Sequence, residues 1–169
     1  FSKTPVIKNE LINRDKVSGV AVAASKELLE NMFKRPNELY FGIDKFPPSK
    51  SMYLSLFRNT KIHQIENHDY VIKKPQDPTD TIAQIWEEMI NFLKDNKHRR
   101  VSFNELFLKW SKPPYGIRQG IIPILALTIY EAHREELALF VDDLFVPDID
   151  DYGISRLFKD ANSIAVRYV

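Results

Sequence analysis

The sequence predicts a mainly helical α+β fold, with a helical N-terminal subdomain over residues 1–76 and a winged-helix-like domain over residues 77–169. Apolar residues recur at three- and four-residue spacing along most of the chain, as in helices that pack on a core. A polar stretch, residues 59–79, divides two such regions and is the best linker candidate. After it come a helix, a short strand, a helix, a turn, a helix and a hairpin, which is the order of a winged helix. Another kind of small α+β domain is the alternative.

The first expected helix has Asp15 or Ser18 as its cap and ends at Arg35-Pro36, because proline cannot continue a helix. Its apolar face consists of Val17, Val20, Ala21, Ala24, Leu28, Met32 and Phe33.

A second helix is expected to begin at Pro47-Pro48, since proline is tolerated in a first turn. Its buried face is predicted to be Met52, Tyr53, Leu56 and Phe57. Within the polar stretch, residues 70–72 predict a short strand, and we expect His63 and His68 to form a solvated pair.

The second half begins with a helix that Asp80 can cap. Its predicted apolar face is Ile82, Ile85, Trp86, Met89, Phe92 and Leu93. Val101 predicts a brief strand, and Ser102 with Glu105 predicts a capping box, in which the two side chains bond reciprocally to backbone N–H groups. The helix that follows is expected to bury Phe103, Leu106, Phe107 and Trp110.

The turn Lys112-Pro113-Pro114-Tyr115-Gly116 should end that helix, and a third helix is expected over about 117–133. Pro123 would either kink this helix or lie in its first turns. Its apolar run has two interpretations, a surface for a partner or a core helix that is packed on all sides.

The last elements are expected to be a hairpin, a helix and a closing strand. Residues 137–141 and 144–146 flank Asp142-Asp143, which predicts a tight turn. Asp150 is the expected cap of a helix that buries Ile154, Leu157 and Phe158, and residues 163–169 form the closing strand.

The sequence contains no pattern that indicates catalysis, a cofactor or a metal site. Cysteine is absent, which favours a reducing cytoplasm, and the histidines lack the paired spacing of a zinc site. No glycine-rich loop precedes a lysine, and turn and capping roles account for the paired aspartates. No apolar run approaches the length of a membrane span. The chain opens at Phe1 without methionine, so we expect a fragment of a larger protein.

Charge is unevenly distributed, although 24 basic and 23 acidic residues nearly cancel. Residues 98–120 hold a single acid among their basic residues, whereas residues 135–151 hold acids and no Lys or Arg. A basic group beside a recognition helix is what phosphate contact requires, so the basic segment predicts a nucleic-acid site, with Arg118 and Gln119 at the start of the third helix. That site would comprise Arg99, Arg100, Lys109, Lys112, Tyr115, Arg118 and Gln119.

Several phrases resemble segments of large bacterial ATPases of phage-defence and restriction loci, including the P-loop proteins of BREX-type systems. These phrases are residues 9–14, Phe46-Pro47-Pro48 with residues 51–53, and residues 113–118 with Gly120. The resemblance implies a non-catalytic C-terminal regulatory or interaction module, whose partners would be other domains or subunits of its parent protein. The alternative is a winged-helix domain that binds double-stranded DNA, which the acidic hairpin and the apolar third helix disfavour.

Overall fold

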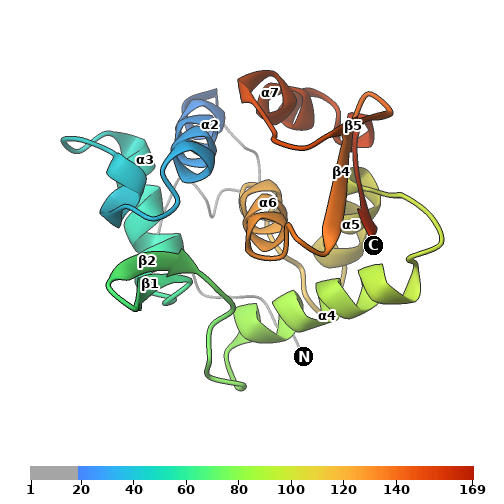
Figure 1. Ribbon diagram of the computed structural model, residues 1–169, viewed down its shortest axis with the longest axis horizontal. Helices are drawn as coiled ribbons and strands as arrows, with labels where there is room; N and C mark the ends of the chain where they lie inside the picture. Colours follow the sequence, from blue (N-terminus) through green and yellow to red (C-terminus); the bar gives the residue numbers. More distant parts are fainter. Residues whose placement is uncertain (1–18) are drawn as a thin grey trace.

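In the computed structural model, which describes residues 19–169, the most apolar of the described helices lies at the centre of an α+β fold (Figure 1). This helix, α6 (Ile122–Ala132), is surrounded by other helices and by a four-stranded antiparallel sheet. All residues from 122 to 130 are buried. The interpretation as a core helix packed on all sides is therefore confirmed.

Helix α6 begins at Ile122, so the predicted start at residue 117 is wrong. Pro123 lies in the first turn, where backbone N–H groups have no partner within the helix, so its missing N–H costs no helical hydrogen bond. The preceding residues form a turn, in which the Ile121 N–H donates to the Arg118 carbonyl oxygen at 3.0 Å. Arg118 and Gln119 consequently precede the helix, and the expectation that they lie at its start is also wrong.

Four helical segments fold the N-terminal part of the described chain: α2 (Gly19–Lys34), the 3₁₀ turn η1 (Leu39–Gly42), α3 (Pro48–Tyr53) and the π-helical turn η2 (Leu54–Arg58). Along α2 the expected face is buried at Ala21, Ala24, Leu28 and Met32. Val20 is 62% exposed, against expectation, and lies in the first turn of α2. Asp15, Val17 and Ser18 lie outside the described residues.

The predicted second helix is confirmed by α3, which begins at Pro48 and continues into η2. Its expected apolar side chains are all buried: Met52, Tyr53, Leu56 and Phe57. Tyr53 and Phe57 pack edge-on against Phe41 of η1, with ring centres 5.1 and 5.0 Å from its own. Aromatic packing of this kind fixes the loop before α3 to the core.

The polar stretch holds a hairpin of β1 (His63–Glu66) and β2 (Asp69–Ile72), of which only the second strand was predicted. The expected solvated histidine pair is wrong for His63, which is buried while His68 is exposed. One ring nitrogen of His63 lies 2.7 Å from the Tyr53 hydroxyl and the other 2.7 Å from the Pro36 carbonyl oxygen. Two long-range hydrogen bonds, which sequence spacing does not reveal, therefore hold this imidazole.

The second half follows the predicted element order. Its elements besides α6 are α4 (Thr81–Asp95), β3 (Val101–Ser102), α5 (Phe103–Ser111), β4 (Leu137–Val141), β5 (Leu144–Val146), α7 (Asp151–Lys159), η3 (Ala161–Ser163) and β6 (Ile164–Tyr168). Three predicted caps are confirmed, because Asp80, Ser102 and Asp150 each accept a backbone N–H of the helix that follows. Local signals of this kind were sufficient to place these helix starts.

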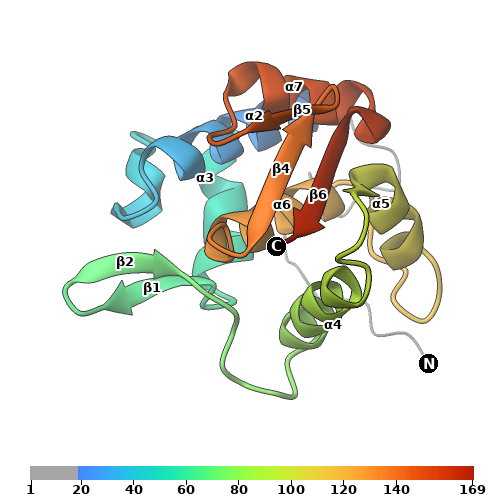
Figure 2. The ribbon, with the colours of Figure 1, turned by 45° about the vertical axis from the view of Figure 1, so that its right-hand side comes forward.

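The larger sheet has the strand order β3-β6-β4-β5, with antiparallel pairs throughout (Figure 2). The predicted hairpin is confirmed: β4 pairs with β5 around Asp142 and Asp143, whose φ angles of 50° and 68° are those of a type I′ turn. Strand β6 lies between β3 and β4, and Val166 pairs with both Val101 and Leu139. The closing strand thus joins the two parts of the sheet.

Side chains from both sides of residue 76 enter one continuous core. Helix α2 contacts α6 and α7, the Thr128 hydroxyl donates to the Met32 sulfur at 3.6 Å, and the rings of Phe33 and Tyr130 lie 6.4 Å apart. The division into residues 1–76 and 77–169 stays a prediction, and the N-terminal helices pack directly on the second half.

Candidate functional site

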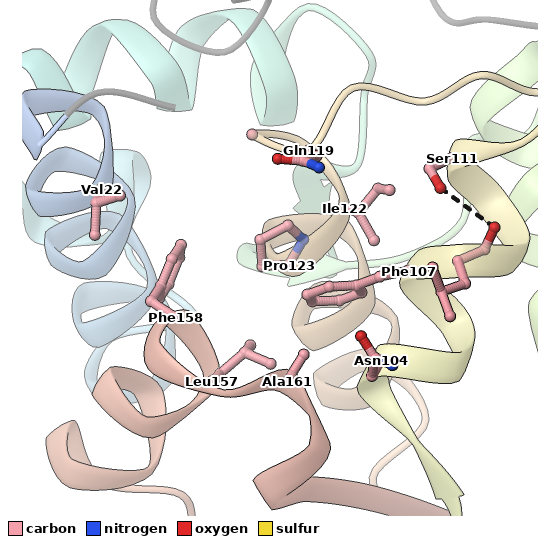
Figure 3. Close-up of a pocket in the computed structure, with 12 residues that line it drawn as sticks. Val22, Asn104, Phe107, Ser111, Gln119, Ile122, Pro123, Leu157, Phe158 and Ala161 are labelled. Atoms are coloured by element: carbon pink, nitrogen blue, oxygen red, sulfur yellow. Dashed lines mark hydrogen bonds between the residues drawn. The ribbon is translucent and has the colours of Figure 1, made fainter. Parts of the chain in front are cut away.

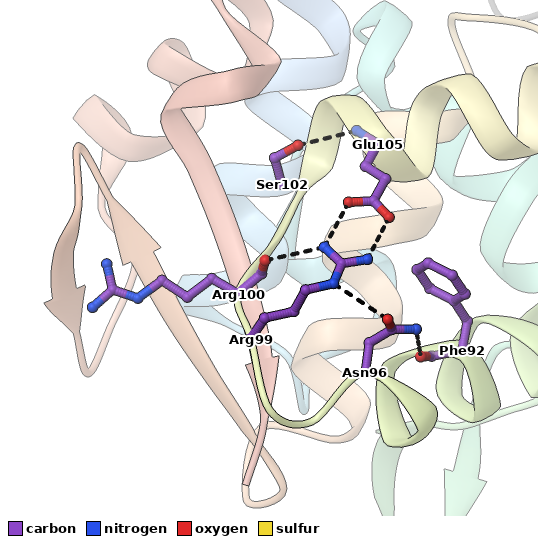
Figure 4. Close-up of polar contacts among 6 residues, drawn as sticks. All are labelled: Phe92, Asn96, Arg99, Arg100, Ser102 and Glu105. Carbon is purple, nitrogen blue, oxygen red and sulfur yellow. Dashed lines mark hydrogen bonds and ion pairs between the residues drawn. The ribbon is translucent and has the colours of Figure 1, made fainter.

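Arg99, the first of the predicted nucleic-acid contacts, is bound to carboxylate and amide oxygens of its own chain (Figure 4). Its two terminal nitrogens donate to the two carboxylate oxygens of Glu105 at 2.9 and 2.8 Å, and its Nε donates to Asn96 at 3.2 Å. The hydrogen bonds from Arg99 hold the pKa of Glu105 below its usual value. One bond of the predicted capping box is confirmed, because the Ser102 hydroxyl accepts the Glu105 N–H. The Glu105 carboxylate binds Arg99, which lies in the connection between α4 and β3.

Arg100 turns away from Arg99 toward the β4–β5 hairpin (Figure 4). Its guanidinium carbon lies 3.8 Å from the ring centre of Phe140. It also donates to the carbonyl oxygen of Asp143 at 3.3 Å and lies 3.9 Å from a carboxylate oxygen of that residue. The basic and acidic segments of the sequence therefore meet in space at this point.

Lys109, Lys112 and Tyr115 lie at the opposite end of α5 from the two arginines. The nine residues of α5 span about 13 Å, so the structure divides the predicted residues into two groups. The Lys109 ammonium lies 4.8 Å from the ring centre of Phe92, while Lys112 is the exposed C-cap of α5. Tyr115 is half-buried against the core.

Gln119 lies at the rim of a pocket of about 440 Å³ between α2, α5, α6 and α7 (Figure 3). The pocket floor is apolar, with the Phe107 ring projecting into it, and its polar groups come from Asn104, Ser111 and Gln119. None of the described residues that line it is charged. An uncharged pocket offers no counterion for a phosphate. The neighbouring Arg118 is exposed.

The β4–β5 hairpin presents large apolar side chains to solvent. Leu144 is 71% exposed and Phe145 is 61% exposed, and both lie on β5, which is an edge strand of the larger sheet. Tyr152, at the start of α7, is 59% exposed and donates to Asp142 at 2.8 Å. The sequence predicts a strand for Leu144 and Phe145 and a helix for Tyr152, and an exposed apolar surface was not predicted there.

Asp142 also accepts from Arg156 at 2.9 Å, and the bonds from Arg156 and Tyr152 lower its pKa. Asp148 likewise accepts from Arg134 at 2.5 Å. Arginines outside the acidic segment therefore offset part of its negative charge.

A chain of polar contacts links α4, the end of α6 and β6, and it was not predicted. The Trp86 N–H donates to His133 Nε2 at 2.9 Å, which leaves the proton on Nδ1, 3.2 Å from Glu136. The Tyr168 hydroxyl donates to the same carboxylate at 2.5 Å. Because the indole occupies the free nitrogen, this histidine cannot accept a proton from a substrate without breaking the contact. Within residues 19–169, no group of three acidic or histidine side chains is arranged to hold a metal ion.

Comparison with known proteins adds no relative: no family model, no curated protein and no solved structure matches the chain. Within residues 19–169, no helix has the length and apolar character that a membrane span needs. The function must consequently be argued from the surfaces of the chain itself.

Proposed function

We propose that this chain is a non-catalytic interaction module that contacts another domain or subunit of a larger protein through its β4–β5 hairpin. The observation that carries the proposal is the exposure of Leu144 and Phe145, at 71% and 61%, on an edge strand. Burial of one such side chain contributes about 1.5–3 kcal/mol, so the pair suffices to anchor a contact. An edge strand also offers backbone groups to which an extended segment of a partner can bond.

The element order from α4 to β5 supports a winged-helix-like second half, in which the hairpin is the wing. The resemblance to ATPases of phage-defence loci suggests the kind of parent protein, in which the ATPase core or a neighbouring subunit would be the partner. A regulatory contact of this kind requires no chemistry from the module itself.

Duplex DNA is the weaker candidate partner. Arg99 and Arg100 already bind Glu105 and the hairpin, and the nominal recognition helix α6 is buried. A groove-reading helix needs polar side chains on an exposed face.

The proposal is tested by photo-crosslinking in cells that produce the protein containing this chain. A benzophenone amino acid would replace Phe145 or, as the matched control, Ile65, which is 62% exposed on the other hairpin. We expect crosslinks to a defined domain or subunit from position 145 alone, and their loss when Leu144→Asp is added. Equal crosslinking from both positions would refute a specific contact at the hairpin.

A second measurement addresses the alternative. Duplex DNA binding would be compared at two salt concentrations between the unchanged chain and an R99Q/R100Q/K112Q/R118Q variant. Salt-sensitive binding that the variant loses would establish DNA as the partner, because neutralised phosphates release counterions.

A further inference from the structure

The loop before α3 carries the most exposed large apolar side chain of the described residues. Phe46 is 88% exposed and lies in the loop that projects at the left edge of Figure 1. The ammonium of Lys50 lies 4.7 Å from its ring centre and 4.2 Å from the ring centre of Tyr40. Arg58 donates to the Tyr40 hydroxyl at 3.2 Å. Aromatic rings and cations thus alternate in a row formed by Phe46, Lys50, Tyr40 and Arg58, which we call the aromatic–cation row.

The backbone holds this row in place. Tyr40, Phe41 and Lys45 have φ angles of 58°, 51° and 58°, a region that side chains of this size rarely adopt. Gly42 has φ 71°, and a Cβ there would lie 2.6 Å from the Arg35 side chain, so glycine is required. Backbone conformations of this kind persist where surrounding contacts determine them.

The loop is further held at both of its ends. Phe41 is fully buried under the rings of Tyr53 and Phe57, and the Ser49 hydroxyl donates to Glu27 of α2 at 2.5 Å. Between these anchors, Asp44, Lys45 and Phe46 face solvent.

Lys45 of the loop and the row cations Lys50 and Arg58 differ from Arg99 and Arg100, because no described carboxylate pairs with them. Among residues 19–169, no ion pair joins Lys45, Lys50 or Arg58 to an acid, whereas Arg99 is paired at 2.8 Å. Two acids share the segment: Glu38, which faces Arg35 at 4.0 Å, and Asp44. The charges of the row remain available to an anionic ligand.

We propose that the aromatic–cation row binds single-stranded nucleic acid, with an unpaired base stacked on Phe46 and phosphates held by Lys50, Lys45 and Arg58. Proteins that bind single strands combine aromatic side chains, on which bases stack, with cations that bind the phosphate backbone. A duplex cannot use this ring, because its bases already stack on each other. An acidic peptide would satisfy the cations but leave the open ring face without a planar partner.

The test uses the chain with a fluorescent twelve-residue oligothymidine and with an abasic phosphodiester of the same length and charge. Phe46→Ala should weaken oligothymidine binding by about 5- to 150-fold, and Lys50→Met should weaken it and reduce its salt dependence. The control Ile65→Ala, at a position that is 62% exposed, should change nothing. Because Phe46 is exposed, its substitution leaves the fold intact, which circular dichroism would verify.

The proposal is overturned if the abasic strand binds as tightly as oligothymidine, or if Phe46→Ala has no effect. It is also overturned if polyglutamate competes as well as the oligonucleotide, since the row would then serve an acidic protein segment. A Leu144→Asp variant should bind oligothymidine normally, so this result is independent of the hairpin proposal.

Discussion

Arg100 and Asp143 lie 43 residues apart in the sequence, yet the Arg100 guanidinium donates to the Asp143 carbonyl oxygen at 3.3 Å. One residue belongs to the basic segment and the other to the acidic segment, so the contact brings the two charge clusters together. The same guanidinium stacks 3.8 Å from the Phe140 ring centre and thereby covers part of the outer face of the sheet. A basic segment in a sequence is therefore no measure of a basic surface.

The burial of α6 predicts a large stability difference between two apolar positions. Ile129 is fully buried and Val20 is 62% exposed. We expect Ile129→Ala to lower the free energy of unfolding by about 2–5 kcal/mol, because a cavity remains in the core. Val20→Ala should change it by less than about 0.5 kcal/mol. Urea denaturation measures both, and similar losses would contradict the placement of α6.

The two tryptophans should respond differently to the same substitution. The Trp86 N–H donates to His133, whereas the buried Trp110 N–H has no hydrogen-bond partner among the described residues. Trp86→Phe leaves a histidine nitrogen without its donor. We therefore expect it to lower the free energy of unfolding by about 1 kcal/mol more than Trp110→Phe does. Chemical denaturation of the two variants gives the difference, and equal costs would show that Trp110 has a partner.

His63 should make the stability depend on pH in mildly acidic solution. Burial lowers the pKa of this imidazole below its ordinary value of 6.5, and the hydrogen bond to Pro36 only partly opposes the shift. The unfolded chain then binds a proton that the folded chain does not. The contribution of His63 to the free energy of unfolding is therefore complete above pH 6.5. Below that pH the free energy of unfolding falls by up to about 1.4 kcal/mol per pH unit, until the pKa of His63 in the folded chain is reached. Comparison with His63→Gln isolates this slope, which should be absent in the variant.

The hairpin turn offers a matched pair of glycine substitutions. Asp142 and Asp143 both have positive φ, which glycine adopts without strain. Asp143→Gly should raise the melting temperature, because a type I′ turn favours glycine at its second position. Asp142→Gly should lower it, since the bonds from Arg156 and Tyr152 would be lost. Calorimetry distinguishes the two, and a fall for both would show that the Asp143 contacts to Arg100 outweigh the backbone strain.

Sequence reasoning succeeded where the determining interaction is local. The caps at Asp80, Ser102 and Asp150 each involve a backbone group within three residues, so spacing was sufficient to find them. The predicted start of α6 was too early because the helix was extended back through Gly120, a residue that favours a turn, although Pro123 marks a first helical turn.

The surroundings of the predicted nucleic-acid residues could not be read from the sequence, because the contacts that determine them are distant in sequence. Nothing near Arg99 or Arg100 shows that one arginine would bind Glu105 and the other the hairpin. His63 looked solvated because its partners, Tyr53 and Pro36, are 10 and 27 residues away. The exposure of Phe46 likewise depends on how the loop is anchored by Phe41, which spacing cannot reveal.

The central position of β6 has a consequence for folding during synthesis. Val101 and Leu139 are joined only through Val166, a residue that the ribosome adds after every other strand of the sheet. Until this last strand arrives, β3 has no partner in the sheet and β4 is paired on one side only, with β5. Strands that are distant in sequence pair slowly. Before they pair, their exposed edges can bond to the wrong strand or bind chaperones.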